Sequence, residues 1–286
     1  MPSLIDIRRR IRSVKNTQQI TKAMKMVSAA KLRKAQDRVI ASRPYARILE
    51  NILANVAAAA GSDDRVMAHP LLARRAEKNV QLILITADRG LAGAFNSNLI
   101  KGAQKFAADN PQARLSYEAV GRKGRDFFRR REATLTGEHI GILNKVQLAD
   151  AAAIAQSSAE RYAKGESDAV YLLYNEFKSV VSQKITLKKL LPITLPENAA
   201  VLDYIYEEPP VELLGSLLPK YVENAIFSAM LESVSSEHAA RMTAMDAATT
   251  NASEVIEKVT LYMNRVRQAS ITKEIIEVVS GAAALE

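Results

Sequence analysis

The chain has 286 residues, 48% of them hydrophobic, and a formal net charge of +9, so it can bury the core of one large domain or two small ones. It contains no cysteine, which excludes disulfides, thiolate nucleophiles and cysteine metal sites. No apolar run approaches the roughly 18 residues of a membrane span, and charged residues from Asp6 to Arg10 stand where a signal peptide needs an apolar segment.

The first segment, residues 1–60, is predicted to be one long helix, because apolar residues recur along it in steps of three or four. This stripe consists of Leu4, Ile7, Ile11, Val14, Met24, Val27, Leu32, Ala35, Val39, Leu49, Leu53 and Val56. Pro44 is expected to bend the helix or to restart it, since proline removes a backbone donor and clashes with the preceding turn.

The basic charge of the chain is concentrated on this first helix. Residues 1–47 hold 13 of the 40 lysines and arginines but only Asp6 and Asp37 as acids, a net charge of +11. Such an excess indicates an acidic partner, and nucleic acid, anionic lipid and an acidic protein surface are all candidates. Nucleic acid is disfavoured because the basic residues share the helix with its apolar stripe and residues 1–44 contain no aromatic residue for stacking.

The middle segment, residues 75–195, alternates short apolar runs with helical patterns. The expected strands are residues 80–86, 114–120, 169–174 and 180–191, and the expected helices are residues 95–108, 122–131 and 147–164. Strands that alternate with helices predict a Rossmann-like α/β domain with a largely parallel sheet.

The turn at Asp88–Gly93 follows a predicted strand and precedes a helix, where a phosphate-binding loop would stand. It has neither the G-x-x-x-x-G-K-[ST] pattern nor the G-x-G-x-x-G pattern, so we interpret it as a structural turn and expect no bound cofactor. The three histidines, His69, His139 and His238, have no partner at metal-ligand spacing. We therefore predict no catalytic residue and no metal site, and we expect His238 to be a packed or partly exposed side chain and not a metal ligand.

The last segment, residues 210–286, is predicted to be a second long helix, because no proline or glycine occurs between Pro219 and Gly281. Its apolar stripe consists of Leu214, Leu218, Val222, Ala225, Ala229, Leu231, Val234, His238, Val255, Val259, Tyr262, Val266 and Ala269. From Ser235 to Ser253 its side chains are mostly small, which we interpret as a surface for contacts that form and break.

Two helices of this length, each with one narrow apolar stripe, favour pairing with each other over the alternative of two ordinary helices in a bundle. The predicted fold is therefore a long antiparallel coiled coil of the N- and C-terminal helices with an inserted Rossmann-like α/β domain. The predicted domains are residues 1–60, 75–195 and 210–286.

Several segments resemble motifs of one known family, the gamma subunit of the F-type ATP synthase. The most specific is Ile271–Ala284, and the segments 240–245 and 267–270 precede it. Near the N-terminus the matching segments are 16–24 and 42–45, and in the middle it is the turn 88–91. The similarity therefore extends over the whole chain.

This resemblance implies a non-catalytic rotor shaft that couples ion flow to ATP synthesis or hydrolysis. Implied partners are three alpha and three beta subunits, the epsilon subunit and the membrane c-ring. Implied contacts with the alpha/beta head are Met24, Lys25, Arg241, Arg267, Gln268, Thr272 and Glu274. The tip from Ile275 onward is expected to turn in an apolar bearing, and Tyr206 and Glu208 are expected to face epsilon and the ring.

The resemblance also implies a peripheral membrane protein on the cytoplasmic face of a bacterial inner membrane, or on the matrix side in a mitochondrion. Membrane association is expected only through the complex. The alternative from the residues alone is a basic coiled-coil protein that binds nucleic acid.

Overall fold

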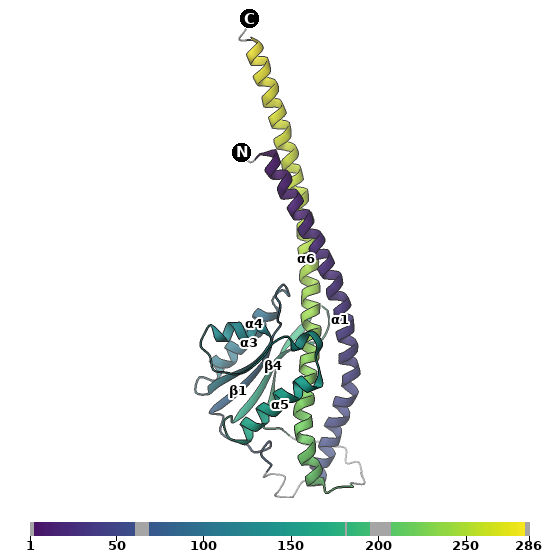
Figure 1. Ribbon diagram of the computed structural model, residues 1–286, viewed down its shortest axis with the longest axis vertical. Helices are drawn as coiled ribbons and strands as arrows, with labels where there is room; N and C mark the ends of the chain where they lie inside the picture. The colour runs from purple at the N-terminus through teal and green to yellow at the C-terminus, as the bar shows by residue number, and fades with distance from the viewer. Residues whose placement is uncertain (1–2, 61–68, 181, 195–206, 284–286) are drawn as a thin grey trace. The chain divides into compact units, whose positions relative to one another are not determined.

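The computed structural model describes residues 3–60, 69–180, 182–194 and 207–283 (Figure 1). The chain divides into two compact units. One unit combines Met1–Ser28 with Met242–Glu286, and the other is Ala29–Arg241. The long helices α1 (Leu4–Ala60) and α6 (Pro210–Ala283) each contribute to both units. None of the described helices is long and apolar enough to cross a lipid bilayer.

The larger unit contains a five-stranded sheet with the order β3-β2-β1-β4-β5. The strands are β1 (Asn79–Ile85), β2 (Arg114–Val120), β3 (Leu135–His139), β4 (Ala169–Phe177) and β5 (Gln183–Leu191). The first four are parallel and β5 runs antiparallel to β4. The expected largely parallel sheet is confirmed, and β3 is a strand that the sequence did not predict.

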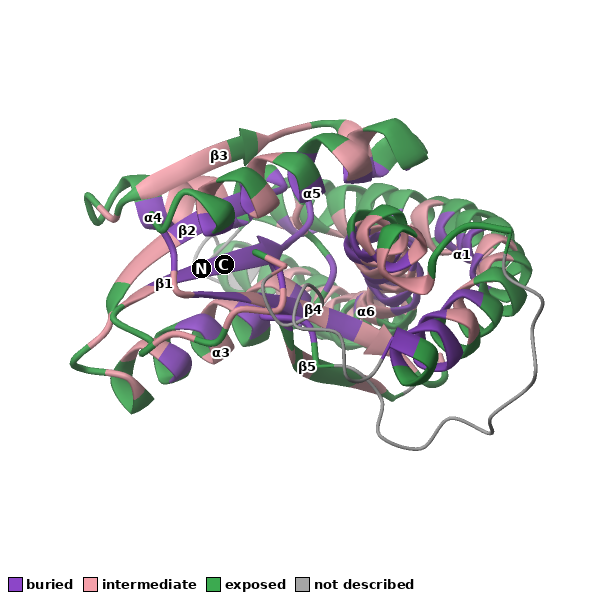
Figure 2. Cartoon of the chain, turned by 90° about the horizontal axis from the view of Figure 1, so that it is seen from below, coloured by how far each residue is buried: buried purple, intermediate pink, exposed green. Residues whose placement is uncertain are grey.

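Alternate residues of β1 enter two different cores, as the two-residue period of a strand requires. Leu82 and Leu84 pack with Phe95 and Leu99 of α3 (Phe95–Asp109), and α4 (Arg122–Arg129) covers the same face. Ile83 and Ile85 pack on the other face, with α5 (Leu148–Ala163), the 3-10 helix η1 (Ile142–Lys145) and the long helices. Figure 2 shows the buried residues gathered on the central strands β1 and β4. The three predicted helices correspond to α3, α4 and α5.

Within the larger unit, α1 and α6 pack through their predicted stripes. The shared cluster includes Ala35, Val39, Leu53 and Val56 of α1 and Leu214, Leu218, Val222 and Ala229 of α6. It also contains Ile226, which the predicted stripe of α6 did not include. One series of buried or half-buried positions of α1 alternates steps of three and four residues, which is the heptad pattern of a left-handed coiled coil. It consists of residues 32, 35, 39, 42, 46, 49, 53, 56 and 60.

Both long helices continue through proline. Pro44 lies inside α1 and Pro219 inside α6, and both side chains are exposed. The expectation that Pro44 restarts the helix is therefore wrong, since the flanking heptad positions Val39 and Leu49 remain buried on one stripe. Packing of that stripe outweighs the loss of one backbone hydrogen bond.

We expect Gly215→Ala in α6 to stabilise the protein by about 0.5–1 kcal/mol, because alanine restricts the unfolded chain and favours the helix. A Cβ atom at this position would meet no atom within 4 Å. Urea unfolding followed by circular dichroism measures the change. Gly124→Ala in α4 is the matched control and should destabilise, since its Cβ would lie 2.9 Å from Thr86 Oγ1.

Candidate functional site

The carboxyl ends of β1 and β4 form the place where an open parallel sheet of this order usually binds a ligand. In this chain α6 crosses that edge. Ser233 donates a hydrogen bond to the carbonyl of Ile85 at 3.4 Å, and Ser236 donates one to the carbonyl of Asn175 at 3.1 Å. The helix therefore takes the position that a nucleotide occupies in dinucleotide-binding folds.

The turn after β1 is braced by one carboxylate. Asp88 accepts hydrogen bonds from the backbone amides of Arg122 at 2.9 Å and Gly141 at 3.0 Å. Those amides belong to the segments that follow β2 and β3. Asp88 thus ties together the ends of three parallel strands, which supports the interpretation of this segment as a structural turn.

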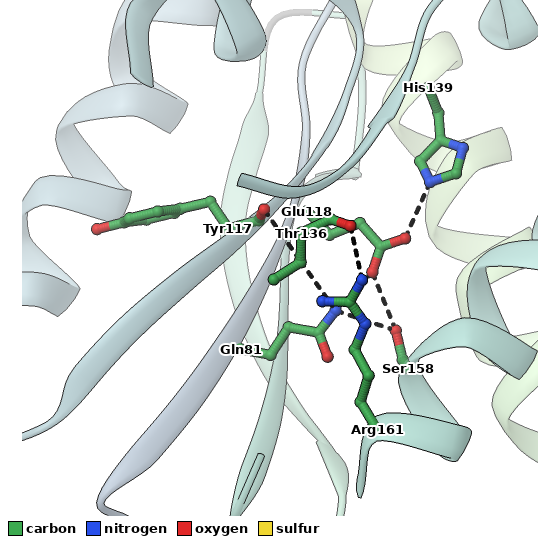
Figure 3. A network of polar contacts seen from close by, with 7 residues as sticks. All are labelled: Gln81, Tyr117, Glu118, Thr136, His139, Ser158 and Arg161. Atoms are coloured by element: carbon green, nitrogen blue, oxygen red, sulfur yellow. Dashed lines mark hydrogen bonds and ion pairs between the residues drawn. The ribbon is translucent and has the colours of Figure 1, made fainter. Parts of the chain in front are cut away.

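A buried polar network lies between the sheet and α5 (Figure 3). Glu118 is almost fully buried and accepts hydrogen bonds from Gln81 at 2.5 Å and from Ser158 at 3.1 Å. Its other carboxylate oxygen lies 2.9 Å from Nε2 of His139. In a hydrolase triad the histidine stands between serine and acid, whereas here Glu118 stands between Ser158 and His139. This order cannot activate the serine, so the network holds β1, β2, β3 and α5 together.

His238 is a half-buried side chain of α6, which agrees with the expectation of a packed or partly exposed residue. Its burial lowers its pKa to about 4, and the positive charges of Arg241 and Lys31 act in the same direction. Its buried Nδ1 has no hydrogen-bond partner. Nowhere in the described ranges do three or more histidine, aspartate or glutamate side chains form a group that could hold a metal ion.

The smaller unit is an antiparallel pair formed by the start of α1 and the last part of α6. Three side-chain contacts join them: Gln18 with Ser253 at 2.6 Å, Thr21 with Thr249 at 2.8 Å, and Lys25 with Asp246 at 2.6 Å. The seven-residue advance from Gln18 to Lys25 on α1 matches the seven-residue return from Ser253 to Asp246 on α6. The predicted antiparallel coiled coil is confirmed, with a partly polar seam.

The predicted stripes are partly wrong in this unit. Val27, Val255 and Tyr262 are exposed, whereas Ser28 and Ala252 are buried. The predicted stripes of this unit consist mainly of large apolar residues and omit seam positions that small and polar residues fill. The heptad spacing from Ile7 nevertheless passes through Thr21 and Ser28.

At the register shown by Gln18 and Ser253, Leu4 stands opposite Arg267. Beyond that residue, no part of α1 that the structure describes is left to cover α6. Large apolar side chains are accordingly exposed there, with Val278 the most open at 72%. They are Ile271, Ile275, Ile276, Val278 and Val279. Ile271, Ile275, Val278 and Val279 follow helical spacing and lie on one face of α6, and exposed large apolar side chains grouped in this way are a feature of interaction sites.

Of the residues expected to contact the alpha/beta head, all except Arg241 lie in the smaller unit. Met24 and Lys25 are half-buried on α1, and Arg267, Gln268, Thr272 and Glu274 are exposed on α6. Thr272 donates a hydrogen bond to the carbonyl of Gln268, and Glu274 accepts one from Ser270. The smaller unit therefore contains six of the seven expected residues.

Arg241 belongs to the larger unit and is buried, with 8% of its surface exposed. Its guanidinium contacts Glu237 and the carbonyl of Gly90. The small residues nearby, including Ser235, Ser236 and Ala239, are also buried, so our interpretation of them as a surface for transient contacts is wrong.

Of the two residues expected at epsilon and the ring, Glu208 is exposed and Tyr206 lies outside the described residues.

Comparison with known proteins gives a consistent result along the whole chain. A family model described as ATP synthase matches residues 3–285. The chain is 65% identical to the ATP synthase gamma chain of Solibacter usitatus and 52% identical to that of Pelotomaculum thermopropionicum, and each comparison covers 100% of both proteins.

Solved structures agree with these relatives. A chain of the central stalk and c-ring structure of the Tetrahymena thermophila mitochondrial ATP synthase is 28% identical, with a TM-score of 0.63 over 80% of this chain and 99% of that one. A chain of the Euglena gracilis mitochondrial ATP synthase rotor is 21% identical and shares the fold, with a TM-score of 0.68 over 94% of this chain and 98% of that one. With the paired terminal helices and the inserted α/β domain, these full-length matches show that the chain belongs to the ATP synthase gamma chain family.

Proposed function

We propose that this chain is the central rotor shaft of an F-type ATP synthase and couples transmembrane ion flow to ATP synthesis or hydrolysis at the beta subunits of the catalytic head. The observation that carries this proposal is the antiparallel pair of the smaller unit, in which α6 extends beyond α1 and exposes apolar side chains from Ile271 to Val279. Membership of the gamma chain family supports it.

The shaft acts on conformation and contributes no catalytic group of its own. A partner shifts an equilibrium only when it contacts the competing conformations differently. The two sides of the smaller unit differ in the way this requires, because α1 carries the basic residues Arg8, Arg9, Arg10, Arg12, Lys15, Lys22 and Lys25. An asymmetric shaft that turns would therefore present a different surface to each beta subunit in succession.

The proposed contacts with the head are Met24 and Lys25 on α1 and Arg267, Gln268, Thr272 and Glu274 on α6. The exposure of the last four leaves them available to a partner. The apolar tip from Ile275 onward would turn in an apolar bearing. Arg241 was expected in the same set, but its guanidinium is engaged within its own chain, so we assign it a different role below.

The proposed partners are three alpha and three beta subunits, the epsilon subunit and the c-ring. The Tetrahymena relative comes from a structure of central stalk and c-ring, which supports assembly into such a complex. Glu208, exposed before α6, and Tyr206 would face epsilon and the ring. The protein would then be peripheral to the membrane, on the cytoplasmic face in a bacterium or on the matrix side in a mitochondrion.

The nucleic-acid alternative loses its support. The basic residues of α1 lie on a helix whose opposite stripe packs against α6, and the named relatives are ATP synthase gamma chains. The same charge fits acidic segments of surrounding protein subunits.

Lys25→Glu tests the proposed head contact. Lys25 pairs with Asp246, and the two side chains are 42% and 55% exposed, so loss of this pair costs only about 0.2–1 kcal/mol of stability. We expect the variant to assemble, but proton pumping per ATP hydrolysed should fall by about twofold to tenfold. The assembled complex in lipid vesicles allows both rates to be measured.

Lys258→Glu is the matched control, since Lys258 is exposed on α6 in the same unit and belongs neither to the proposed contacts nor to the basic residues of α1. It changes the net charge equally and should leave the ratio close to that of the unmodified complex. Tight coupling in Lys25→Glu would remove Lys25 from the contact set. Failure of the unmodified chain to join and activate a hexameric ATPase would contradict the proposed function itself.

A further inference from the structure

We propose that Arg241 is a positioning residue that fastens α6 to the carboxyl edge of the sheet, so that torque passes between the α/β domain and the shaft helix through this contact. The inference rests on the proposed function. It concerns a joint inside this chain and is separate from any contact with the head.

The contact is a bridge made by one buried guanidinium. Nη2 of Arg241 donates a hydrogen bond to Glu237 Oε1 at 2.7 Å and another to the carbonyl of Gly90 at 3.1 Å, and Nε lies 3.4 Å from the same carbonyl. Arg241 and Glu237 are each 8% exposed. A buried charge pair with several directed hydrogen bonds fixes geometry more sharply than apolar contact does.

The sheet end of the bridge is rigidly supported. Gly90 lies two residues after Asp88, whose carboxylate binds the amides of Arg122 and Gly141. Asn96 accepts a hydrogen bond from the amide of Ala87 at 2.9 Å, which secures the same turn from α3. A force on the Gly90 carbonyl is therefore shared by the ends of β1, β2 and β3.

The other contacts along this edge resist rotation of α6 less effectively. Ser233 and Ser236 reach the carbonyls of Ile85 and Asn175 with short side chains close to the helix axis. Apolar contacts between α6 and the sheet are non-directional, so they oppose separation more than turning. The long side chain of Arg241 provides a lever arm, and torque at a given force grows with the length of the arm.

The charges around the bridge agree with this role. Burial raises the pKa of Glu237, while the adjacent Arg241 opposes that rise and favours the carboxylate. Asp88 and Lys31 are the other charged groups that act on Glu237. Without the guanidinium, a buried carboxylate would lose its main partner and the Gly90 carbonyl would lose its donors. The joint would then loosen on both sides.

The test uses the assembled complex in lipid vesicles with Arg241→Gln, Arg241→Lys and Glu237→Gln. We expect Arg241→Gln to hydrolyse ATP but to pump about threefold to tenfold fewer protons per ATP. Arg241→Lys, which keeps a charged donor, should recover part of the loss. Arg265→Gln, an exposed arginine of α6 outside the proposed contacts, is the matched control and should keep the native ratio.

Hydrogen exchange on the isolated full chain separates the joint from a head contact. Arg241→Gln should speed amide exchange in residues 88–94 and 233–241 when no other subunit is present. Double replacement of Glu237 and Arg241 should lower coupling no more than the stronger single replacement, since the two act together. Where Arg241→Gln fails to fold, Glu237→Gln and Arg241→Lys give the same readouts.

Native coupling in Arg241→Gln would overturn the inference. A loss of coupling with unchanged exchange in the isolated chain would also overturn it, because the residue would then act on the head. Both outcomes leave the proposed function intact, since that function fails only when the unmodified chain does not couple hydrolysis to pumping.

Discussion

Gly121→Ala is expected to destabilise the α/β domain by at least about 4 kcal/mol, enough to unfold it at moderate temperature. Gly121 has a φ of +97°, and a Cβ atom there would lie 2.0 Å from the carbonyl oxygen of Thr86. The backbone fixes the position of the Cβ atom, and the atom that it meets is a backbone oxygen, so no side-chain rotation relieves the collision. Thermal unfolding followed by circular dichroism measures the loss.

Gly141→Ala is the control that separates backbone strain from collision. Gly141 has a φ of +83°, but its Cβ would meet only Asn144 Nδ2, at 4.0 Å. This variant should therefore cost only the roughly 1 kcal/mol of a left-handed conformation. Equal losses in the two variants would contradict the assigned collision at Thr86.

The repeating parts of the fold could be predicted from the sequence because each has a clear period. Leu82 to Ile85 form an apolar run that a central parallel strand needs on both faces, and the stripe from Leu32 to Val56 follows helical spacing. β3 was missed because Leu135–His139 has the half-exposed, mixed composition of an edge strand. Its place in the sheet is set by pairing with β2, which no local pattern reveals.

The candidate site was less predictable because it depends on contacts between distant segments. The tip from Ile271 to Val279 could be found as an apolar segment, but its exposure depends on the pairing register, which places Leu4, the first residue of α1, opposite Arg267. The family motif containing Arg241 was visible in the sequence. The hydrogen bond from Arg241 to the carbonyl of Gly90 could not be predicted, because 151 residues separate the two positions.

Small residues on α6 show how composition alone can mislead. Ser235 and Ser236 are fully buried, because close approach of the helix to the sheet leaves no room for larger side chains there. The same residue types further along, such as Thr243 and Thr250, are exposed. The sequence pattern is alike in both stretches, and the presence of the sheet beside one of them determines the difference.

His238 is expected to make stability fall as the solution becomes acidic. Its pKa is about 4 in the folded chain against 6.5 for an ordinary histidine. Between these values the unfolded chain binds a proton that the folded chain rejects, so the free energy of unfolding decreases as pH falls from 6.5 towards 4. Because the ring is only partly buried, we expect a loss of about 1–2 kcal/mol between pH 7.5 and pH 5.

His238→Leu removes this titration and isolates it from other groups. The pKa values of Glu237 and Glu232 are raised by burial, so these carboxyls give an opposite slope that is common to both proteins. Leucine fills a similar volume and removes the Nδ1 atom that lacks a hydrogen-bond partner, so stability at pH 7.5 should be kept. Urea unfolding at both pH values should show a smaller acid loss in the variant. Parallel curves would mean that His238 is protonated as easily when folded as when unfolded.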